Sequence, residues 1–509
     1  PIAAKVNVVP VIITATSFVL LRFRLTWGTR KSIPFSDPDS ETRWNAMKSV
    51  ILKALFRLIH VFALSSVSAF AVGERTESWP NVLLILADDM GFSDLGCYGA
   101  VHIETPNLDR LAARGLRFTQ FYSCGRCWPS RTSILSGYYP QQMHGDNLPG
   151  VTIMNRPDRL EHRRVADQLV PHRLRELGYR TYRSTKLNDV FHRLDPDGPR
   201  GLDHMGFDRG YLLWDYNRFF GPESHSLDNR PLPKPAPEED YYATTAIAQH
   251  TIDFLKDHAV NHADQPFFSY VAFIAPHFPL HALPEDIAKY RDAFLEGWDA
   301  LRAERAQKLA ELGFPKVTPA PRDPDIYSPA GIGGNAAAAQ AQIDPREVVG
   351  AVPWDSLTDE QKRFQVTKMA IHAAMVDRMD REVGRIVDQL KAMGVFENTI
   401  ILFASDNGAD ASLIVRGDGH DPEAPPGSAG SYLCLGPGWA GASNSPFHLY
   451  KMFSHEGGIA TPLIVHWPAG IKDEGAWRHA PGHFIDVAPT LVELAGGSWD
   501  GTPSPGIDL

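Results

Sequence analysis

Two pairs of adjacent oxygen-bearing side chains are the first residues in this chain whose type and spacing point to chemistry. Asp88-Asp89 and Asp406-Asn407 each follow directly on a short, continuous apolar run. Such a run predicts a strand buried on both faces, so each pair falls at a strand end. Oxygen ligands without Cys or His suit a hard cation and favour Ca²⁺ over Zn²⁺. The pattern therefore predicts one Ca²⁺ site built from these four residues.

Cysteine chemistry is the second signal. The chain has four cysteines, at 97, 124, 127 and 434, too few for a disulfide framework. If the protein is exported, a disulfide between Cys97 and Cys124 is possible. Cys124-x-x-Cys127 is compatible with a redox pair or half of a zinc site, but the sequence holds no second such pair. Cys127 is followed by Trp-Pro-Ser-Arg, which favours a different role.

Alternating strand and helix patterns must position these residues. They predict an α/β fold with a mostly parallel central sheet and helices on both faces. In such sheets ligands gather at the carboxyl ends of strands, where both oxygen pairs and His277 fall. Surface loops are expected at 313–353, which includes the alanine-rich stretch 336–341, and at 417–441. The predicted strands are 81–87, 117–122, 179–183, 266–274 and 398–404, and the predicted helices are 105–114, 129–135, 159–177 and 364–393.

Composition and the N-terminal region bear on class and location. Hydrophobic residues make up 43% and charged residues 22% of 509 residues, which is typical of a globular chain, and the net charge of −10 argues against nucleic acid as a partner. Residues 47–71 have the basic start, apolar stretch and Ala-x-Ala end of a signal peptide, which predicts a periplasmic or secreted protein. The apolar run is too short for a stable membrane span. Residues 1–46 are then expected to be a non-native upstream extension.

The stretch Cys-Trp-Pro-Ser-Arg at 127–131, followed by Ile-Leu-Ser-Gly at 134–137, resembles the signature of formylglycine-dependent sulfatases of the alkaline phosphatase superfamily. Several further segments resemble that family in the same order, and their joint occurrence is highly specific. The resemblance covers about 80–509. Its further segments are 80–99, 105–109, 398–408, 444–447 with Lys451, and the Glu-Gly-Gly segment 454–464.

The resemblance implies hydrolysis of sulfate esters of a small molecule or glycan. A maturation enzyme would oxidise Cys127 to formylglycine, whose hydrate attacks sulfur, and this side chain would share the Ca²⁺ with the four oxygen ligands. Arg131 would steady the hydrate. Lys186 and Lys451 would bind the sulfate or the ester oxygen, and His277 would serve the leaving group.

The chain departs from the family at two places. Where the family often has Gly-Lys-Trp-His, this chain has Thr-Lys-Leu-Asn, and Asn188 cannot take a proton near neutral pH. His192 is an alternative base. Family members usually continue into a small C-terminal antiparallel subdomain, so the catalytic domain 80–509 is expected to be truncated. Two other readings stay open: a phosphodiesterase or phosphonate hydrolase on the same fold, and a non-catalytic sulfoglycan-binding protein.

Overall fold

The computed structural model describes residues 79–143, 169–186, 202, 205–215, 217–236, 238–316, 318–417 and 419–499. The chain from 77 onward forms one compact unit. The predicted upstream extension, the signal peptide, Asn188 and His192 lie outside the described residues, so those assignments stay predictions.

A parallel block forms the centre of the sheet. Strand β1 (Asn81–Ala87) lies between β9 (Thr399–Ser405) and β8 (Phe267–Ala272), and β4 (Arg180–Lys186) and β5 (Arg209–Leu213) continue from β8. All four pairings are parallel. Because helices cover both faces, β1, β8 and β9 are mostly apolar and almost wholly buried rather than alternating, whereas β4 is buried but largely polar. The carboxyl ends of all five strands meet at one edge of the sheet.

Antiparallel strands extend this block on both sides, so the sheet is mixed. Within the described residues it has ten strands in the order β11-β2-β10-β9-β1-β8-β4-β5-β6-β7. Strand β10 is antiparallel to both of its neighbours, and β6 is antiparallel to β5 and β7. The outer strands are β2 (Leu116–Phe118), β6 (His225–Leu227), β7 (Arg230–Pro231), β10 (Leu463–His466) and β11 (Ala476–Arg478).

The single strand predicted at 117–122 is divided in two. After β2 the chain leaves the main sheet, and β3 (Phe121–Tyr122) pairs with β12 (Gly482–His483) in a separate small sheet. The backbone N–H of Thr119 instead donates to the Arg478 carbonyl at 2.9 Å. The corner falls at Thr119-Gln120, two polar residues between Phe118 and Phe121, which the prediction of one continuous strand passed over.

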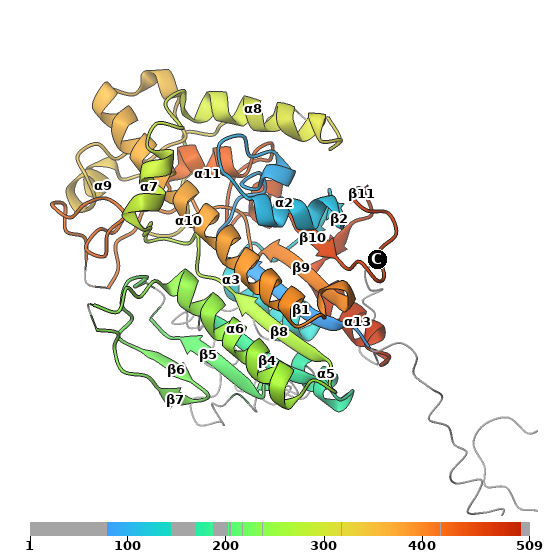
Figure 1. Ribbon diagram of the computed structural model, residues 1–509. Helices are drawn as coiled ribbons and strands as arrows, with labels where there is room; N and C mark the ends of the chain where they lie inside the picture. Colours follow the sequence, from blue (N-terminus) through green and yellow to red (C-terminus); the bar gives the residue numbers. More distant parts are fainter. Residues whose placement is uncertain are drawn as a thin grey trace, which may run out of the picture. The chain divides into compact units, whose positions relative to one another are not determined.

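Helices cover both faces, as predicted. Helix α10 (Asp359–Ala392) packs with α6 (Ala243–Asn261) across one face, as Figure 1 shows. The other face carries α3 (Cys127–Ser136), α5 (Val170–Glu176) and α13 (Phe484–Leu494), which contact one another. The remaining helices of four or more residues in the described chain are α2 (Pro106–Ala113), α7 (Pro284–Tyr290), α8 (Gly297–Glu311), α9 (Ala336–Gln342), α11 (Pro437–Ser443) and α12 (Glu456–Ile459).

The loop predicted for the alanine-rich stretch is wrong, because that stretch is helix α9. Alanine has the highest intrinsic helix propensity, and Asn335 caps the helix by accepting a hydrogen bond from the Ala338 N–H at 3.0 Å. Helix α11 likewise begins inside the second predicted loop, with Pro437 in its first turn. Low complexity was mistaken for irregular structure in the first case.

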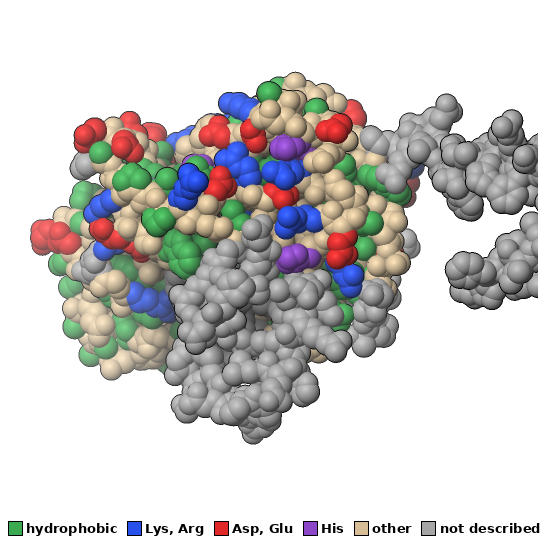
Figure 2. Space-filling view, turned by 90° about the horizontal axis from the view of Figure 1, so that it is seen from below, with side chains coloured by type: hydrophobic (Ala, Val, Ile, Leu, Met, Phe, Trp, Pro, Cys, Tyr) green, Lys and Arg blue, Asp and Glu red, His purple; other side chains and the backbone are tan. Residues whose placement is uncertain are grey.

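Surface and cysteine features complete the fold. On the face seen in Figure 2, positive and negative side chains lie intermixed. Among the described helices, none combines the length and apolar character needed to cross a membrane. All four cysteines are free in the structure, so it does not contain the possible disulfide between Cys97 and Cys124.

Candidate active site

The register of β1 against β9 brings the two oxygen pairs together. Ala87 lies opposite Ser405, and the Asp406 N–H donates to the Ala87 carbonyl at 3.1 Å, so Asp88 and Asp406 leave the sheet side by side. Asp88, Asp89, Asp406 and Asn407 are all buried, none more than 3% exposed. Distant parts of the sequence therefore converge at one point because two parallel strands end together.

Asp89 has a strained backbone. Its φ of 63° lies in the left-handed region, which a residue with a Cβ rarely adopts, and this aims its side chain back toward the cluster. The Asn407 Nδ2 group donates to Asp89 Oδ1 at 2.7 Å and to the Gly408 carbonyl at 2.9 Å. This leaves the buried Asn407 Oδ1 without a hydrogen-bond donor among the described residues.

Cys127 is the first residue of helix α3, two residues earlier than the sequence predicts. Pro129 falls in the first turn, where a missing N–H is tolerated. The Cys127 Sγ atom lies 3.3 Å from Asp88 Oδ1 and 3.9 Å from Asp89 Oδ1. Burial raises the pKa of this thiol to about 12. Cys124 points elsewhere, with its Sγ atom 3.3 Å from Ser133 Oγ, so the two cysteines do not act as a pair.

Arg131 links the two strand ends rather than reaching toward the thiol. It lies four residues after Cys127, one helical turn on, and is 2% exposed. Its Nε donates to Asp406 Oδ2 at 2.8 Å, and its Nη2 lies 3.3 Å from Asp88 Oδ2. Burial opposes the charge, but Asp406 outweighs it and raises the pKa of Arg131. Its observed contacts are therefore those of a clamp on the carboxylates.

Two lysines reach the cluster from opposite sides. Lys186 ends β4, is buried, and contacts Asp88 Oδ2 through its Nζ atom. Burial lowers the pKa of Lys186 to about 7. Lys451 Nζ lies 2.6 Å from Asp89 Oδ1 and 3.3 Å from Asp410 Oδ2. Asp410 was not predicted from the sequence, although its place three residues after Asn407 could have suggested it.

His277 approaches the same carboxylates from the segment after β8. Its Nδ1 atom bonds the Phe278 carbonyl, which can only accept, so Nδ1 carries the proton of the neutral ring. Its Nε2 atom lies 3.5 Å from Asp89 Oδ2. Burial, with Lys186 and Lys451 adding to it, holds the pKa of His277 well below its usual range. The second histidine of this segment, His281, instead bonds the Ser431 carbonyl at 2.7 Å and shapes the loop.

The cluster fits a hard divalent cation. One ligand atom each from Asp88, Asp89, Cys127 and His277 lies within 4.8 Å of all the others. Burial, reinforced by Asp410 and Asp406 against the lowering from Lys451, raises the pKa of Asp89 to about 7. An unbonded amide oxygen and a carboxylate held with difficulty in its charged form are each what a cation would satisfy.

A cavity of about 380 Å³ opens beside the start of α3. Two of its lining residues, Arg126 and Met452, are the chain neighbours of Cys127 and Lys451. Apolar and polar groups both line it, as in small-molecule sites. Its other side-chain walls include Cys124, Tyr139, Gln141, Phe453, Ser454 and His483.

Comparison with known proteins identifies the class. The family model named Sulfatase matches residues 80–498, and the chain belongs to the sulfatase family of sulfuric ester hydrolases. An uncharacterised sulfatase of Schizosaccharomyces pombe is 32% identical over 82% of this chain and 75% of its own length. An arylsulfatase of Klebsiella aerogenes is 29% identical over 85% of this chain and 90% of its own length. The human N-acetylgalactosamine-6-sulfatase is 27% identical, and 62% of its length is covered.

Solved structures support the fold. The structure of Ps i-CgsB in complex with k-i-k-neocarrahexaose matches with a TM-score of 0.53 and 24% identity, over 83% of this chain and 73% of that one. The structure of BT4656 in complex with D-glucosamine-2-N,6-O-disulfate matches with a TM-score of 0.53 and 20% identity, over 84% and 78% of the two chains. The α/β architecture is therefore that of known sulfatases.

Proposed function

We propose that this sulfuric ester hydrolase works through formylglycine at position 127, with Ca²⁺ at the adjoining carboxylates. One observation carries this proposal: the Cys127 side chain begins helix α3 and lies 3.3 and 3.9 Å from Asp88 and Asp89. A helix N-terminus favours an anion such as sulfate through its free N–H groups. The reacting position is thus next to both an anion site and a cation site.

The unmodified thiol is a poor candidate for the nucleophile. With its pKa raised to about 12, Cys127 is almost wholly protonated at neutral pH, and the thiolate is the reactive form. Formylglycine would supply a hydrated aldehyde, whose first hydroxyl takes the sulfuryl group and whose second allows sulfate to be released. Buried and inert as a thiol, Cys127 is better placed as the precursor of such a group than as a catalyst itself.

Asp88, Asp89, Asp406 and the Oδ1 atom of Asn407 would hold the cation. Bound Ca²⁺ would act as a Lewis acid on a sulfate oxygen. Arg131 keeps Asp88 and Asp406 in place through its contacts at 3.3 and 2.8 Å. We therefore assign Arg131 to positioning through its Nε bond to Asp406, while its Nη1 atom, which has no hydrogen-bond partner among the described residues, would be free to steady the hydrate.

The remaining buried cations and the histidine face the substrate side. Lys186 and Lys451 would balance the charge of the sulfate group, each from its own segment. His277 would serve the leaving-group side through its Nε2 atom, since its Nδ1 proton is fixed by the Phe278 carbonyl. Because burial and the two lysines hold the pKa of His277 well below its usual range, the ring would be neutral at rest, and Nε2 would carry a proton only while one passes to the departing alcohol.

The substrate class, location and maturation partner are also proposals. Two proteins of similar fold bind sulfated sugars by their descriptions, which supports a sulfated glycan, or a small sulfate ester, for this chain. The signal-like segment 47–71 supports export to the periplasm or the medium. Formylglycine would require a maturation enzyme acting on the segment around Cys127.

The test is to produce the protein with a formylglycine-generating enzyme and compare its turnover of 4-nitrophenyl sulfate and bis(4-nitrophenyl) phosphate. We expect the sulfate ester to be preferred and Cys127→Ala to lose at least about a thousandfold in kcat/KM. Cys124→Ala, three residues away and outside the cluster, is the matched control and keeps most of the activity. A preference for the phosphodiester, or an active Cys127→Ala enzyme, would contradict the proposal.

A further inference from the structure

The active-site residues follow successive strands along one edge of the sheet, and the row continues past them. Asp406, Asp88 and His277 follow β9, β1 and β8, and Lys186 ends β4. The next strand is β5, whose Leu213 lies opposite Lys186. Trp214 is therefore the next residue of this row, at the same edge of the sheet as the reacting centre.

Trp214 is unusual in being both exposed and fixed. It is 37% exposed, and it is the one tryptophan among the large apolar side chains that the described residues leave exposed. Its indole N–H donates to Ser226 Oγ at 3.2 Å, and its backbone N–H donates to the Ser224 carbonyl at 3.0 Å. The ring is therefore both accessible and held at a set angle.

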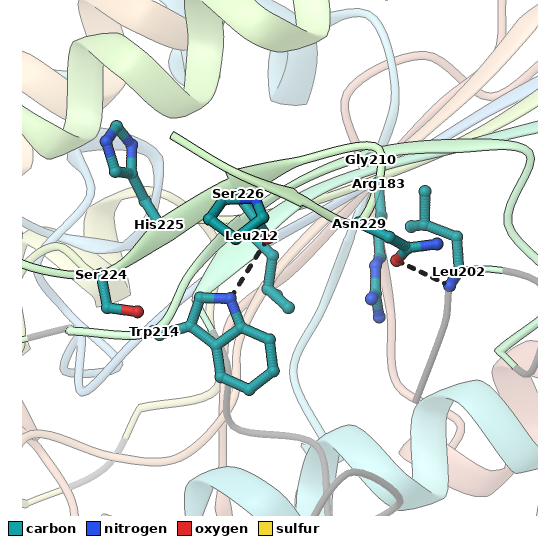
Figure 3. Close-up of a pocket in the computed structure, with 10 residues that line it drawn as sticks. Arg183, Leu202, Gly210, Leu212, Trp214, Ser224, His225, Ser226 and Asn229 are labelled. Carbon is teal, nitrogen blue, oxygen red and sulfur yellow. Dashed lines mark hydrogen bonds between the residues drawn. The ribbon is translucent and has the colours of Figure 1, made fainter. Parts of the chain in front are cut away.

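A cavity of about 200 Å³ lies against this ring. In Figure 3 the Trp214 indole and the Arg183 side chain project to the same side of β5 and β6, with Leu212 between them. Leu202, which also lines the cavity, belongs to the core cluster that contains Ile134 of helix α3, so the cavity opens on the face of the sheet that carries Cys127.

The polar wall of the cavity is also pre-formed. Asp228 and Asn229 have φ values of 49° and 64°, as the two central residues of a tight hairpin turn between β6 and β7. Asp228 fixes this turn to β5 by accepting from Arg209 at 2.8 Å and from the Gly210 N–H at 3.0 Å. Asn229 Oδ1 accepts from the Leu202 N–H at 3.1 Å, which leaves its Nδ2 group as a donor on the cavity wall.

We propose that this cavity is a sugar-binding subsite, in which Trp214 stacks against a ring of the glycan that carries the reacting sulfate ester. This inference rests on the proposed function and names the part of the substrate that the reacting centre does not hold. A sugar ring offers one face of polarised C–H bonds, which suits the negative face of an indole, and a rim of hydroxyls. Asn229 and Ser224 supply polar groups of the kind that such a rim requires.

Size and distance restrict the ligand. The cavity is smaller than the 300–1,000 Å³, roughly, of sites for drug-sized ligands, so it suits one ring rather than several. Neighbouring strands lie about 4.8 Å apart, so β5 is about 14 Å from β1 and its Asp88-Asp89 pair. A monosaccharide sulfate cannot fill both places. The subsite is therefore expected to bind oligosaccharides. Because its side chains are already held in place, binding does not require them to become ordered.

The test separates binding from catalysis. Size-fractionated sulfated mono-, di-, tetra- and hexasaccharides from carrageenan, chondroitin sulfate and heparin are titrated into the Cys127→Ala protein by calorimetry. We expect affinity to rise between the monosaccharide and the tetrasaccharide of at least one series. Trp214→Ala in that background should weaken tetrasaccharide binding about tenfold or more, and Trp214→Phe should restore part of it.

The control is Trp467→Ala. The Trp467 indole N–H also donates to a side-chain oxygen, Asn398 Oδ1 at 3.2 Å, but it follows the antiparallel strand β10 and so lies at the opposite edge of the sheet. This variant should bind tetrasaccharides like the parent, and equal melting temperatures exclude misfolding of any variant.

Two results would overturn the subsite: no longer fraction of any series binds the parent better than its monosaccharide, or Trp214→Ala binds tetrasaccharides unchanged. Neither depends on turnover. A protein that passes this binding test but fails to hydrolyse 4-nitrophenyl sulfate with Cys127 restored and matured would refute the proposed function and leave the subsite standing.

Discussion

Asp89 and Asp94 are buried carboxylates five residues apart, and their pKa values are shifted in opposite directions. Burial alone would raise the pKa of Asp94, but Arg305 and His372 outweigh it and hold that pKa well below its usual range. The oxygens of Asp94 accept from Arg305 at 2.7 Å, His372 at 2.9 Å and the Gly91 N–H at 2.9 Å. Both oxygens of Asp94 therefore have hydrogen-bond donors within the protein.

Asp89 is incomplete by the same measure. Its pKa is raised to about 7 by burial, with Asp410 and Asp406 adding to the effect, although Lys451 lies 2.6 Å away. Asn407 beside it keeps an unbonded oxygen. The difference shows how a buried charge that serves the fold can be told from one that serves a ligand. Asp94 has its hydrogen-bond partners within the protein, and Asp89 is the carboxylate that the proposed cation would satisfy.

The largest contrast is expected from Asp89→Asn. We expect kcat/KM for 4-nitrophenyl sulfate to fall by about a thousandfold or more, because a ligand of the proposed cation is lost. The pKa of Asp89 is raised on folding, so its stabilising effect is present below about 3.8 and is lost as pH rises through 7. Asparagine has no charge to bury, but it leaves the buried Lys451 with only Asp410 at 3.3 Å, so the melting temperature at pH 8 should fall less than it does for Asp94→Asn. A large fall in melting temperature would show that Asp89 serves the fold.

Asp94→Asn should lower the stability of the fold strongly and affect the reacting centre less than Asp89→Asn does. Removing one partner of a buried ion pair leaves Arg305 and His372 facing a neutral amide, which costs about 3–5 kcal/mol of folding free energy. The loss should be seen in urea unfolding at pH 7, where the depressed pKa of Asp94 contributes fully, and should shrink in acid as that carboxylate protonates. A change below about 1 kcal/mol would mean that the triad is not a structural element.

Calcium should stabilise the folded protein by binding at the Asp89 cluster and not at Asp94. A ligand at one hundred times its Kd stabilises the folded state by about 2.7 kcal/mol, so Ca²⁺ should raise the melting temperature of chelator-treated protein. Asn407→Ala, which removes the unbonded oxygen, should weaken this response, whereas Asp94→Asn should keep it in spite of its lower starting temperature. An identical calcium response in wild type and Asn407→Ala would remove Asn407 from the ligand set.

The smallest expected effect concerns the half-buried His250 and the buried His466, which belong to neither carboxylate cluster. Burial lowers the pKa of His250 and of His466 to about 4. Below pH 6.5 the unfolded chain binds protons that these folded side chains refuse, so stability falls as pH drops from 6.5 toward 4. His250→Gln should flatten part of this slope in urea unfolding at stepped pH. An unchanged slope would assign the acid sensitivity to other groups.

Much of the site could be predicted because its signals are local. Asp88-Asp89 and Asp406-Asn407 each follow an apolar run, and parallel strands end at a common edge, so their convergence follows from periodicity and topology. The signature around Cys127 is likewise contiguous. The three central strands β1, β8 and β9 followed from apolar runs, since strands buried on both faces leave an unbroken apolar pattern, whereas β5 was not predicted.

What the sequence did not reveal depends on long-range packing. The clamp by Arg131 on two carboxylates, and the contact of Asp410 with Lys451, exist only once separate segments are brought together. The corner between β2 and β3 falls at Thr119 and Gln120, and the change of pairing partner from β11 to β12 involves segments more than 350 residues further along the chain. Helix α9 was missed for a different reason: its alanines were read as low complexity, although helix propensity points the other way.

The most direct test of the central claim is the chemical state of residue 127 in active enzyme. Protein produced with a formylglycine-generating enzyme is digested, and the peptide that spans Cys127 is analysed by mass spectrometry before and after an aldehyde-specific reagent. We predict that sulfur is lost, that the reagent adds to this peptide, and that the modified fraction tracks specific activity across preparations. Full turnover from protein whose residue 127 is entirely an unmodified thiol would contradict the account.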